Sequence, residues 1–516
     1  MKDLSDLCLQ VISRNFQLKS LPPSAKQRLL YFLIDHDLLQ PALLPSICYH
    51  LLCPQLTQLT LQRSIYIDDA FLEALAGVRA KLRKLEIIRC GRVSDAGLAA
   101  LLRTQGELRE LGLNWLTING SAFPNFSASG SLESLNLKGC AAVASHYIVQ
   151  LDLEAIAASL GNNLECLNIS ECLQLRQEGL LRLAAHCGRL KIVKLKEGMN
   201  IAPTGLEGLV LNSRHLTTLD LSFCSRNEHK LTAEVLEALP ESLEKLVLRG
   251  VDTTATELEF YEMCHGLPQL RSLNLSGFGL LSDQFLGGVL QILGPQLQCL
   301  DLGGSFDKLT DVGIQHISEF CTNGLVALSL NFLHKLNMES LAELLSDPQR
   351  ALRMENLCLA SCTSLAPAVL QALALNATNL QKLDLSGVGG GVLDDALLER
   401  LVERAGASLV AVYLRGNPQL SDAAVSALAR NCPNLRLVSL SGITGVTDSA
   451  MKSLAQRCHG LEEVSLSGCQ MISKQMLNFL QDECRGRVSY YHVVPNGQYE
   501  GSLLAKNLDT GEFVWL

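Results

Sequence analysis

Long apolar stretches are missing from this sequence of 516 residues, although hydrophobic residues make up 48% of it. The densest short run, residues 29–34, is closed off by Arg28 and Asp35. It falls far short of the roughly 20 residues that span a bilayer. The first six residues, Met1 to Asp6, are too acidic for a secretory or mitochondrial leader. We therefore expect no membrane segment and a location in the cytoplasm, the nucleus or both.

Motifs for catalysis and cofactor binding are also missing. The glycine-rich stretch 387–391 lacks the Lys-Ser/Thr pair of a phosphate-binding loop. Cys48, His50 and Cys53 are zinc-ligand types but have no fourth ligand at a standard spacing. None of the 11 histidines has a Ser or Cys partner in a recognisable motif. The net charge of −9 argues against a broad nucleic-acid groove. The sequence therefore predicts a protein that is not an enzyme and holds no cofactor or metal.

A short pattern, L-x-x-L-x-L followed by a small or polar residue, recurs from residue 56 almost to the C-terminus. The spacing is about 24–32 residues, in or near the range of leucine-rich repeats. Its first positions are Leu56, Leu82, Leu108, Leu132, Leu164, Leu190, Leu216, Leu243, Leu270, Leu297, Leu325, Met354, Leu380, Leu409, Leu435 and Leu461. One such unit cannot bury its apolar face alone, so neighbouring units must stack into a solenoid.

Each copy combines the period of a strand with the period of a helix. In residues 82–90, Leu85 and Ile87 alternate with polar residues, as in a half-buried strand. Ser94 or Asp95 then precedes apolar residues at helical spacing, as a helix cap does. The sequence therefore predicts an α/β solenoid with a concave parallel sheet and convex helices. The step from Leu132 to Leu164 is the longest, and its extra residues, about 141–150, are expected to form a loop.

Cysteine is plentiful, with 18 residues, and much of it falls at one phase just after the predicted strands: Cys90, Cys140, Cys172, Cys224, Cys362 and Cys469. At that phase a thiol is expected to be reduced and buried as a small hydrophobic group. The pattern resembles the cysteine-containing leucine-rich repeats of F-box/LRR ubiquitin-ligase receptors, over residues 56 to about 488. In several copies we read glycine at the cysteine position, namely Gly250, Gly277 and Gly387.

Residues 1–55 do not follow the repeat. Leu4, Cys8 and Ile12 are spaced i, i+4, i+8, with Leu7 and Val11 on the same helical face. This spacing resembles the BC box, the helix by which SOCS-box and VHL-box proteins bind elongin C. The resemblance implies elongin B/C as partners, with Leu4 as the anchor in a pocket and Cys8 packing closely behind it.

Two resemblances compete for the next stretch. Leu21 and Pro22 begin a segment, residues 21–30, that is similar to a cullin box, with Pro22 and Pro23 suited to a helix start. Ser24 stands where the cullin 5 pattern has proline, which favours cullin 2 or cullin 3. The same segment loosely resembles an F-box, which binds the Skp adaptor. A third interpretation is a helical cap that shields the open end of the solenoid.

Residues between and after the strand leucines should face the concave side and bind a partner protein. A basic stretch is predicted at Lys138, Lys194, Lys196, Lys245 and Arg249, which would suit an acidic or phosphate-bearing segment. Aromatic anchors are predicted at Trp115, Phe223, Phe278, Phe332 and Tyr413, the residue types that dominate interface energies.

The sequence divides into residues 1–55, repeats over 56–487, and a cap or tail over 488–516, where 495–497 read as a turn. We predict the substrate-recognition subunit of a cullin-RING ubiquitin ligase. Some fungal DNA-repair receptors share its order of an elongin-C box before leucine-rich repeats. The alternatives are a Skp-binding receptor and a scaffold or signalling protein whose N-terminus only caps the repeats.

Overall fold

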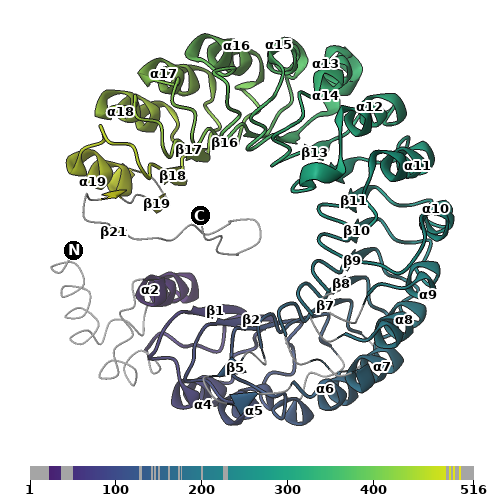
Figure 1. Cartoon of the computed structure of the whole chain (residues 1–516). Helices are drawn as coiled ribbons and strands as arrows, with labels where there is room; N and C mark the ends of the chain where they lie inside the picture. The colour runs from purple at the N-terminus through teal and green to yellow at the C-terminus, as the bar shows by residue number, and fades with distance from the viewer. Residues whose placement is uncertain are drawn as a thin grey trace. The chain divides into compact units, whose positions relative to one another are not determined.

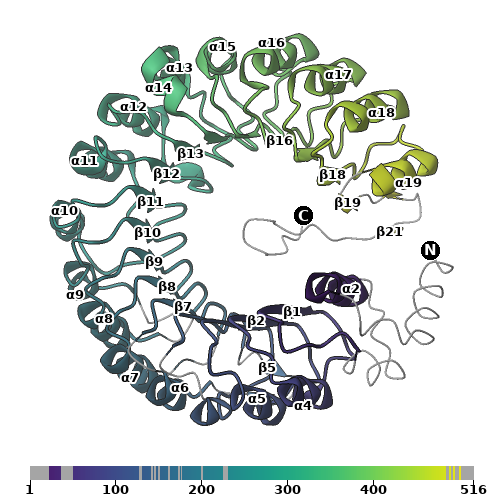
Figure 2. The same ribbon diagram turned by 180° about the vertical axis from the view of Figure 1, so that it is seen from behind.

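The computed structural model describes residues 22–35, 50–126, 131–140, 143–144, 147–148, 151–160, 163–172, 175, 177–198, 201–224, 230–483, 487–489, 492–493 and 499–500. The chain divides into two compact units, Met1–Leu270 and Arg271–Leu516. Within each unit, strands line the inner side of an arc and helices its outer side (Figures 1 and 2). The predicted leucine-rich-repeat solenoid with a parallel sheet is confirmed.

Among the described residues, the first helix of unit 1 is α2 (Pro23–Asp35). The parallel strands of unit 1 are β1 (Gln58–Gln62), β2 (Lys84–Ile88), β3 (Glu110–Asn114), β4 (Ser134–Asn136), β7 (Cys166–Asn168), β8 (Ile192–Lys194), β9 (Thr218–Asp220) and β10 (Lys245–Val247), each paired with the next. The outer elements are α4 (Asp69–Val78), α5 (Asp95–Leu102), η2 (Phe123–Asn125), α6 (Leu153–Ser159), α7 (Gln177–His186), α8 (Pro203–Asn212), α9 (Ala233–Glu237) and α10 (Glu257–His265).

Unit 2 repeats this plan. Its parallel strands are β11 (Ser272–Asn274), β12 (Cys299–Asp301), β13 (Ala327–Ser329), β14 (Asn356–Cys358), β15 (Lys382–Asp384), β16 (Ala411–Tyr413), β17 (Leu437–Ser439), β18 (Glu463–Ser465) and β19 (Arg487–Ser489). The outer elements are α11 (Asp283–Leu293), η3 (Phe306–Lys308), α12 (Asp311–Phe320), α13 (Glu339–Ser346), α14 (Pro348–Arg353), α15 (Pro367–Asn376), α16 (Asp395–Ala405), α17 (Asp422–Asn431), α18 (Asp448–Arg457) and α19 (Lys474–Glu483).

The core of each unit lies between the sheet and the helices. In β2, Leu85 and Ile87 are fully buried while Lys84, Glu86 and Ile88 are half-buried on the other face. The same leucine of each strand is aligned with the leucine of the next, as Leu85 is with Leu111. Burial of such a side chain is worth about 1.5–3 kcal/mol, so stacking the repeats supplies the stability that one repeat lacks.

At the helix starts, a cap residue (Ser, Thr or Asp) followed by an aspartate has two functions, of which the sequence indicated one. Ser94 caps α5 as predicted, because its side chain accepts from the amide of Ala96. The following aspartate instead reaches the next repeat. Asp69 accepts from the amide and hydroxyl of Ser94 at 2.8 and 2.6 Å. Asp395 binds Ser421 in the same way in unit 2. The aspartates therefore link neighbouring repeats on the helical side.

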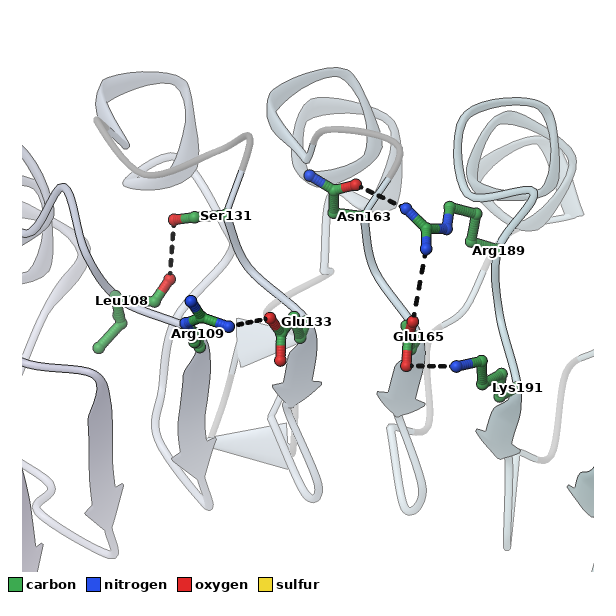
Figure 3. A network of polar contacts seen from close by, with 8 residues as sticks. All are labelled: Leu108, Arg109, Ser131, Glu133, Asn163, Glu165, Arg189 and Lys191. Atoms are coloured by element: carbon green, nitrogen blue, oxygen red, sulfur yellow. Dashed lines mark hydrogen bonds and ion pairs between the residues drawn. The ribbon is translucent and has the colours of Figure 1, made fainter.

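Ion pairs link neighbouring repeats near the beginnings of the strands. In unit 1, Arg109 bonds to Glu133 at 2.7 Å and Lys191 bonds to Glu165 at 2.8 Å (Figure 3). Arg189 reaches both Glu165 and Asn163. The side chains of these charged groups are about a third or more exposed, so solvent screens each pair and it contributes little to stability.

Some repeats depart from the strand, cap and helix pattern. The 24-residue step from Leu108 to Leu132 is too short for a full helix, and a 3-10 turn, η2, stands there. The extra residues after Leu132, expected to form a loop, contain the short antiparallel strands β5 (Val143–Ala144) and β6 (Tyr147–Ile148). The repeat after Leu325 carries two helices, α13 and α14.

The end of the repeats lies slightly beyond the predicted boundary of residue 487. Strand β19 pairs in parallel with β18, so it continues the sheet to Ser489. Beyond it, β20 (His492–Val493) pairs antiparallel with β21 (Tyr499–Glu500). The turn predicted at 495–497 lies between these two strands in the chain but outside the described residues, as do residues 501–516.

Candidate functional site

A tight turn after each strand puts one residue per repeat in the left-handed backbone region. We call these residues the turn ridge. In unit 1 they are Arg63, Arg89, Trp115, Gly139, Glu171, Glu197, Phe223 and Gly250, and in unit 2 they are Gly277, Gly304, Phe332, Ser361, Gly387, Gly416, Gly442 and Gly468. Their φ angles lie between 53° and 78°. Each ridge residue stands seven positions after the first leucine of its repeat.

Hydrogen bonds between repeats explain this conformation. The amide of Trp115 donates to the carbonyl of Lys138 in the next repeat at 2.8 Å. The amide of Gly416 donates in the same way to Ser441 at 2.9 Å. The turn therefore continues the ladder of the parallel sheet past the strand end. Glycine enters this region at no steric cost, whereas another L-residue loses roughly 1–2 kcal/mol.

Trp115 is held between the two neighbouring repeats of unit 1. The guanidinium carbon of Arg89, from the preceding repeat, lies 5.1 Å from its ring centroid. Gly139, from the following repeat, lies so close that an added Cβ would stand 2.5 Å from ring atoms of Trp115. The indole is therefore sandwiched and half-buried, with its orientation fixed. A cation over an aromatic face adds about 0.5–1 kcal/mol at an exposed site such as this one.

Phe223, four repeats further along unit 1, also contacts a glycine and an arginine, but both come from the following repeat. Its ring lies against Gly250 of the next repeat, where a Cβ would collide with it. The guanidinium carbon of Arg249 lies 5.5 Å from the ring centroid. Phe223 is half-buried and Arg249 is exposed. In both predicted aromatic anchors of unit 1, the ring therefore packs against a glycine and has an arginine guanidinium near it.

The predicted basic stretch is divided by acidic residues. Glu171 on the turn ridge pairs with Lys138 at 3.3 Å and with Lys196 at 3.9 Å. The side chains of Lys138 and Glu171 are only 15% and 17% exposed, so most of this ion pair is covered by neighbouring residues. Lys194 is exposed on β8 beside the cluster. Lys245 is exposed at the start of β10, and the ridge residue of its repeat, Gly250, lies further along the chain beyond the end of that strand.

The aromatic residues predicted in unit 2 differ from one another. Phe278 is fully buried and packs against Phe285 with ring centroids 5.8 Å apart, so the prediction that it faces a partner is corrected. It stands one position after the turn ridge, where other repeats carry the buried cysteine. Phe332 is 43% exposed on the turn ridge. Tyr413 is half-buried in β16, with the Lys382 ammonium 5.6 Å from its ring centroid.

The phased cysteines are buried hydrogen-bond donors. The thiol of Cys140 donates to the carbonyl of Leu113, and that of Cys362 to Leu330, each in the preceding repeat. Burial raises the pKa of both thiols to about 12. Asn417 takes the place of cysteine in its repeat and donates to the carbonyl of Leu385 at 2.8 Å.

This alignment corrects one sequence interpretation. Gly250, Gly277 and Gly387 belong to the turn ridge, and the cysteine positions of their repeats hold Val251, Phe278 and Val388. Among the residues that the structure describes, the cysteines are free, and no His, Cys, Asp or Glu group could hold a metal ion. Within the same residues, no helix has the length and apolar character to cross a membrane.

Most of the predicted adaptor-binding residues lie outside the described residues, namely Leu4, Leu7, Cys8, Val11, Ile12 and Leu21. Pro22 is exposed, and α2 begins after it at Pro23, as the two prolines indicate. The helix covers the first strand of unit 1. Gln27 and the hydroxyl of Tyr31 donate to the carbonyl of Gln58 at 3.1 and 3.3 Å, and Leu30 and Leu33 are fully buried.

Sequence reasoning missed four members of this site. Glu171 lies one repeat after Lys138 and one repeat before Lys196, a spacing from which its two ion pairs could have been predicted. Gly139 and Gly250 gave a clearer signal, because each follows an aromatic residue of the same phase in the preceding repeat. Arg89 stands at that phase one repeat before Trp115.

Comparisons with known proteins agree with the repeat architecture. The sequence profile of the family described as Leucine Rich repeat matches residues 212–225. Three solved structures resemble the chain at low identity. A Rad7 and Elc1 complex in yeast has 16% identity and a TM-score of 0.42, covering 92% of this chain and 91% of that one. An internalin (inlF) from Listeria monocytogenes has 16% identity and a TM-score of 0.37, covering 77% and 88%.

The third is a TLR13–ssRNA13 complex, with 18% identity and a TM-score of 0.38, covering 80% of this chain and 58% of that one. Likenesses of this degree do not bear on function. The site must be interpreted from its own residues.

Proposed function

We propose that this chain is the substrate-recognition subunit of a cullin-RING ubiquitin ligase, without an active site of its own, and that it acts in the cytoplasm, the nucleus or both. In this proposal residues 4–12 bind elongin C, and unit 1 binds the substrate protein. Residues 21–30 then contribute to the contact with the cullin, with cullin 2 or cullin 3 favoured.

The observation that carries the proposal is the set of side chains on the turn ridge of unit 1. Trp115 and Phe223 adopt a backbone conformation that costs them free energy, and both stay partly open to solvent. Strained residues of this kind persist where they serve a function. Aromatic residues and arginine are also the types that carry most of the energy in protein interfaces.

The adaptor half rests on the sequence pattern of residues 4–12 and on the place of α2. In α2, Leu30 and Leu33 are buried, and Gln27 and Tyr31 contact the first strand through Gln58. The spacing of Leu4, Leu7, Cys8, Val11 and Ile12 predicts a separate apolar helical face earlier in the chain. Such a face needs a partner, and its resemblance to a BC box favours elongin C.

The test is a binding assay of the purified full-length chain with elongin B/C and, separately, with the Skp adaptor. We expect elongin B/C to bind and the double variant Leu4→Ala, Cys8→Phe to lose that binding with an unchanged melting temperature. Arg28→Ala, on the exposed side of α2, is the matched control and should bind as the wild type does. Binding to the Skp adaptor alone would replace the proposal with the F-box-like alternative.

A second candidate function is a non-enzymatic scaffold whose N-terminus only caps the repeats. The hydrogen bonds from Gln27 and Tyr31 to Gln58 favour it, because they satisfy an exposed edge of the sheet. In that case neither adaptor binds, and the variant Leu4→Ala, Cys8→Phe lowers the melting temperature.

A further inference from the structure

We propose that unit 1 binds an extended acidic segment of its partner protein, laid across the strands from Trp115 to Phe223. This inference rests on the proposed function and names the chemistry of the substrate. Four observations carry it: the paired aromatic sites, the distance between them, the charge between them, and the covering of the Trp115 ring.

The two aromatic sites share three parts, although the arginine comes from the preceding repeat at Trp115 and from the following repeat at Phe223. Each ring comes from the turn ridge, lies against a glycine of the next repeat and carries an arginine within 5.5 Å of its centroid. Such rings are held in place before any partner arrives, which lowers the entropy that binding must offset. A segment that meets both sites therefore has two fixed apolar anchor points with a guanidinium beside each.

The distance between the sites fits a short extended peptide. Trp115 and Phe223 are four repeats apart on the turn ridge, with Gly139, Glu171 and Glu197 between them. Parallel strands lie about 4.8 Å apart, so the anchors are separated by about 19 Å. An extended chain rises about 3.3 Å per residue, so about six residues cover that distance.

The surface that includes both anchors carries more cations than acids at the turn ends of its strands. Lys138, Lys194 and Lys196 stand between the anchors against Glu171, Glu197 and Asp220. The excess comes from Arg89 beside Trp115 and Arg249 beside Phe223. All three acids already have partners: Glu171 pairs with Lys138 and Lys196, Glu197 pairs with Lys196 at 3.8 Å, and Asp220 accepts from Ser222. Lys194 and Arg249 are exposed. This balance complements a segment with acidic side chains between two apolar ones.

The same observations disfavour a nucleic-acid strand. Single-stranded nucleic acid binds basic grooves by stacking its bases on open aromatic faces. The indole of Trp115 has Arg89 on one side and Gly139 on the other, because these residues come from the repeats that flank it. Its edge, and not its face, is therefore open to a partner, as suits an aliphatic or aromatic side chain of a peptide.

The experiment is a selection from a phage-displayed library of random 12-residue peptides on the full-length chain, without adaptor proteins. We expect enriched peptides with acidic residues between two apolar residues about six positions apart. A labelled enriched peptide should bind Phe223→Gly and Lys194→Glu at least tenfold more weakly than the wild type. Phe332→Gly removes an aromatic residue from the turn ridge of unit 2, and it should leave the affinity within twofold.

Trp115 also provides a direct signal. In a Trp515→Phe background it is the remaining one of the 2 tryptophans, so the selected peptide should shift its fluorescence. The inference is overturned if no peptide is enriched, if Phe223→Gly binds as well as the wild type, or if a 12-residue oligothymidylate competes with the peptide and quenches Trp115. Because no elongin is present, failure of the ligase assignment leaves this result unaffected.

Discussion

The turn ridges of the two units have the same backbone and different side chains. In both units the ridge residue is left-handed and its amide extends the sheet toward the next repeat. In unit 2 the ridge is glycine except at Phe332 and Ser361. In unit 1 glycine occurs only at Gly139 and Gly250, the two residues on which aromatic rings rest. The backbone is therefore a requirement of the fold, and the side chains of unit 1 are an addition to it.

Under the proposed function, the side chains of the unit 1 ridge lower the stability of the fold and serve to bind a partner. A glycine ridge satisfies the hydrogen bonds between repeats at least cost, as Gly387, Gly416, Gly442 and Gly468 do. Arg89, Trp115 and Phe223 each accept a less favourable backbone region. Only part of that cost returns through ring packing and the two arginine contacts. Under the proposed function, partner binding explains the remaining cost.

The largest effect is expected where a ridge glycine supports a ring. Gly139→Ala should destabilise the fold by about 2–4 kcal/mol, because it adds a left-handed alanine and a collision with Trp115. Urea unfolding of unit 1 measures it. The double variant Trp115→Gly, Gly139→Ala should recover the collision part, about 1–3 kcal/mol. If the double variant is no more stable than Gly139→Ala, the ring does not rest on Gly139.

A smaller loss is expected from a ridge glycine without a ring. An added Cβ at Gly442 would stand 3.6 Å from its nearest neighbour, which is ordinary contact. Gly442→Ala should therefore cost only the backbone term, about 1–2 kcal/mol, in the unfolding of unit 2. A loss as large as that of Gly139→Ala would show that the two ridges do not differ in this way.

A still smaller change is expected when an exposed ridge aromatic is removed. Phe332→Gly relieves the backbone cost but gives the unfolded chain more freedom and loses some ring contact. These effects oppose one another, so the free energy of unfolding should change by no more than about 1 kcal/mol. Thermal unfolding checks it, and a loss above about 2 kcal/mol would make Phe332 a packing residue.

The two units should differ least in how their phased cysteines make stability depend on pH. Burial raises the pKa of Cys140 and Cys224 in unit 1, and of Cys362 in unit 2, to about 12 from the ordinary 9.0. The folded thiols therefore stay neutral while unfolded ones ionise. Their contribution to stability is complete below about pH 9 and declines as the pH rises toward 12. Thiol labelling at pH 8 should be slow in native protein, and rapid labelling of Cys140 and Cys362 would contradict this.

Much of the fold was predictable because it depends on periodicity. The leucine positions fixed the strands and their register, and the Ser94 type of cap fixed the helix starts. The aspartate links were not predicted, since Asp69 and Ser94 are 25 residues apart and only the stacked repeats bring them together. The 3-10 turn η2 was also missed, although its step of 24 residues leaves little room for a helix.

The site was predictable in residue type and not in arrangement. Trp115 and Phe223 were chosen for their place just after a strand, and both stand on the turn ridge. Phe278 stands one position later and points into the core, a difference that the strand period alone does not resolve. The strand period did not predict the ion pairs of Glu171, because each pair joins residues of two repeats.

The central claim, that the side chains of the unit 1 ridge serve recognition and not stability, is tested most directly by one variant. Arg89→Gly, Trp115→Gly and Phe223→Gly combined give unit 1 a ridge like that of unit 2. Its melting temperature and its client proteins, identified by proximity labelling, should be measured against the wild type. We predict a melting temperature within about 2–4 °C, unchanged elongin C binding and loss of the clients. A strongly lowered melting temperature with the same clients would contradict the account.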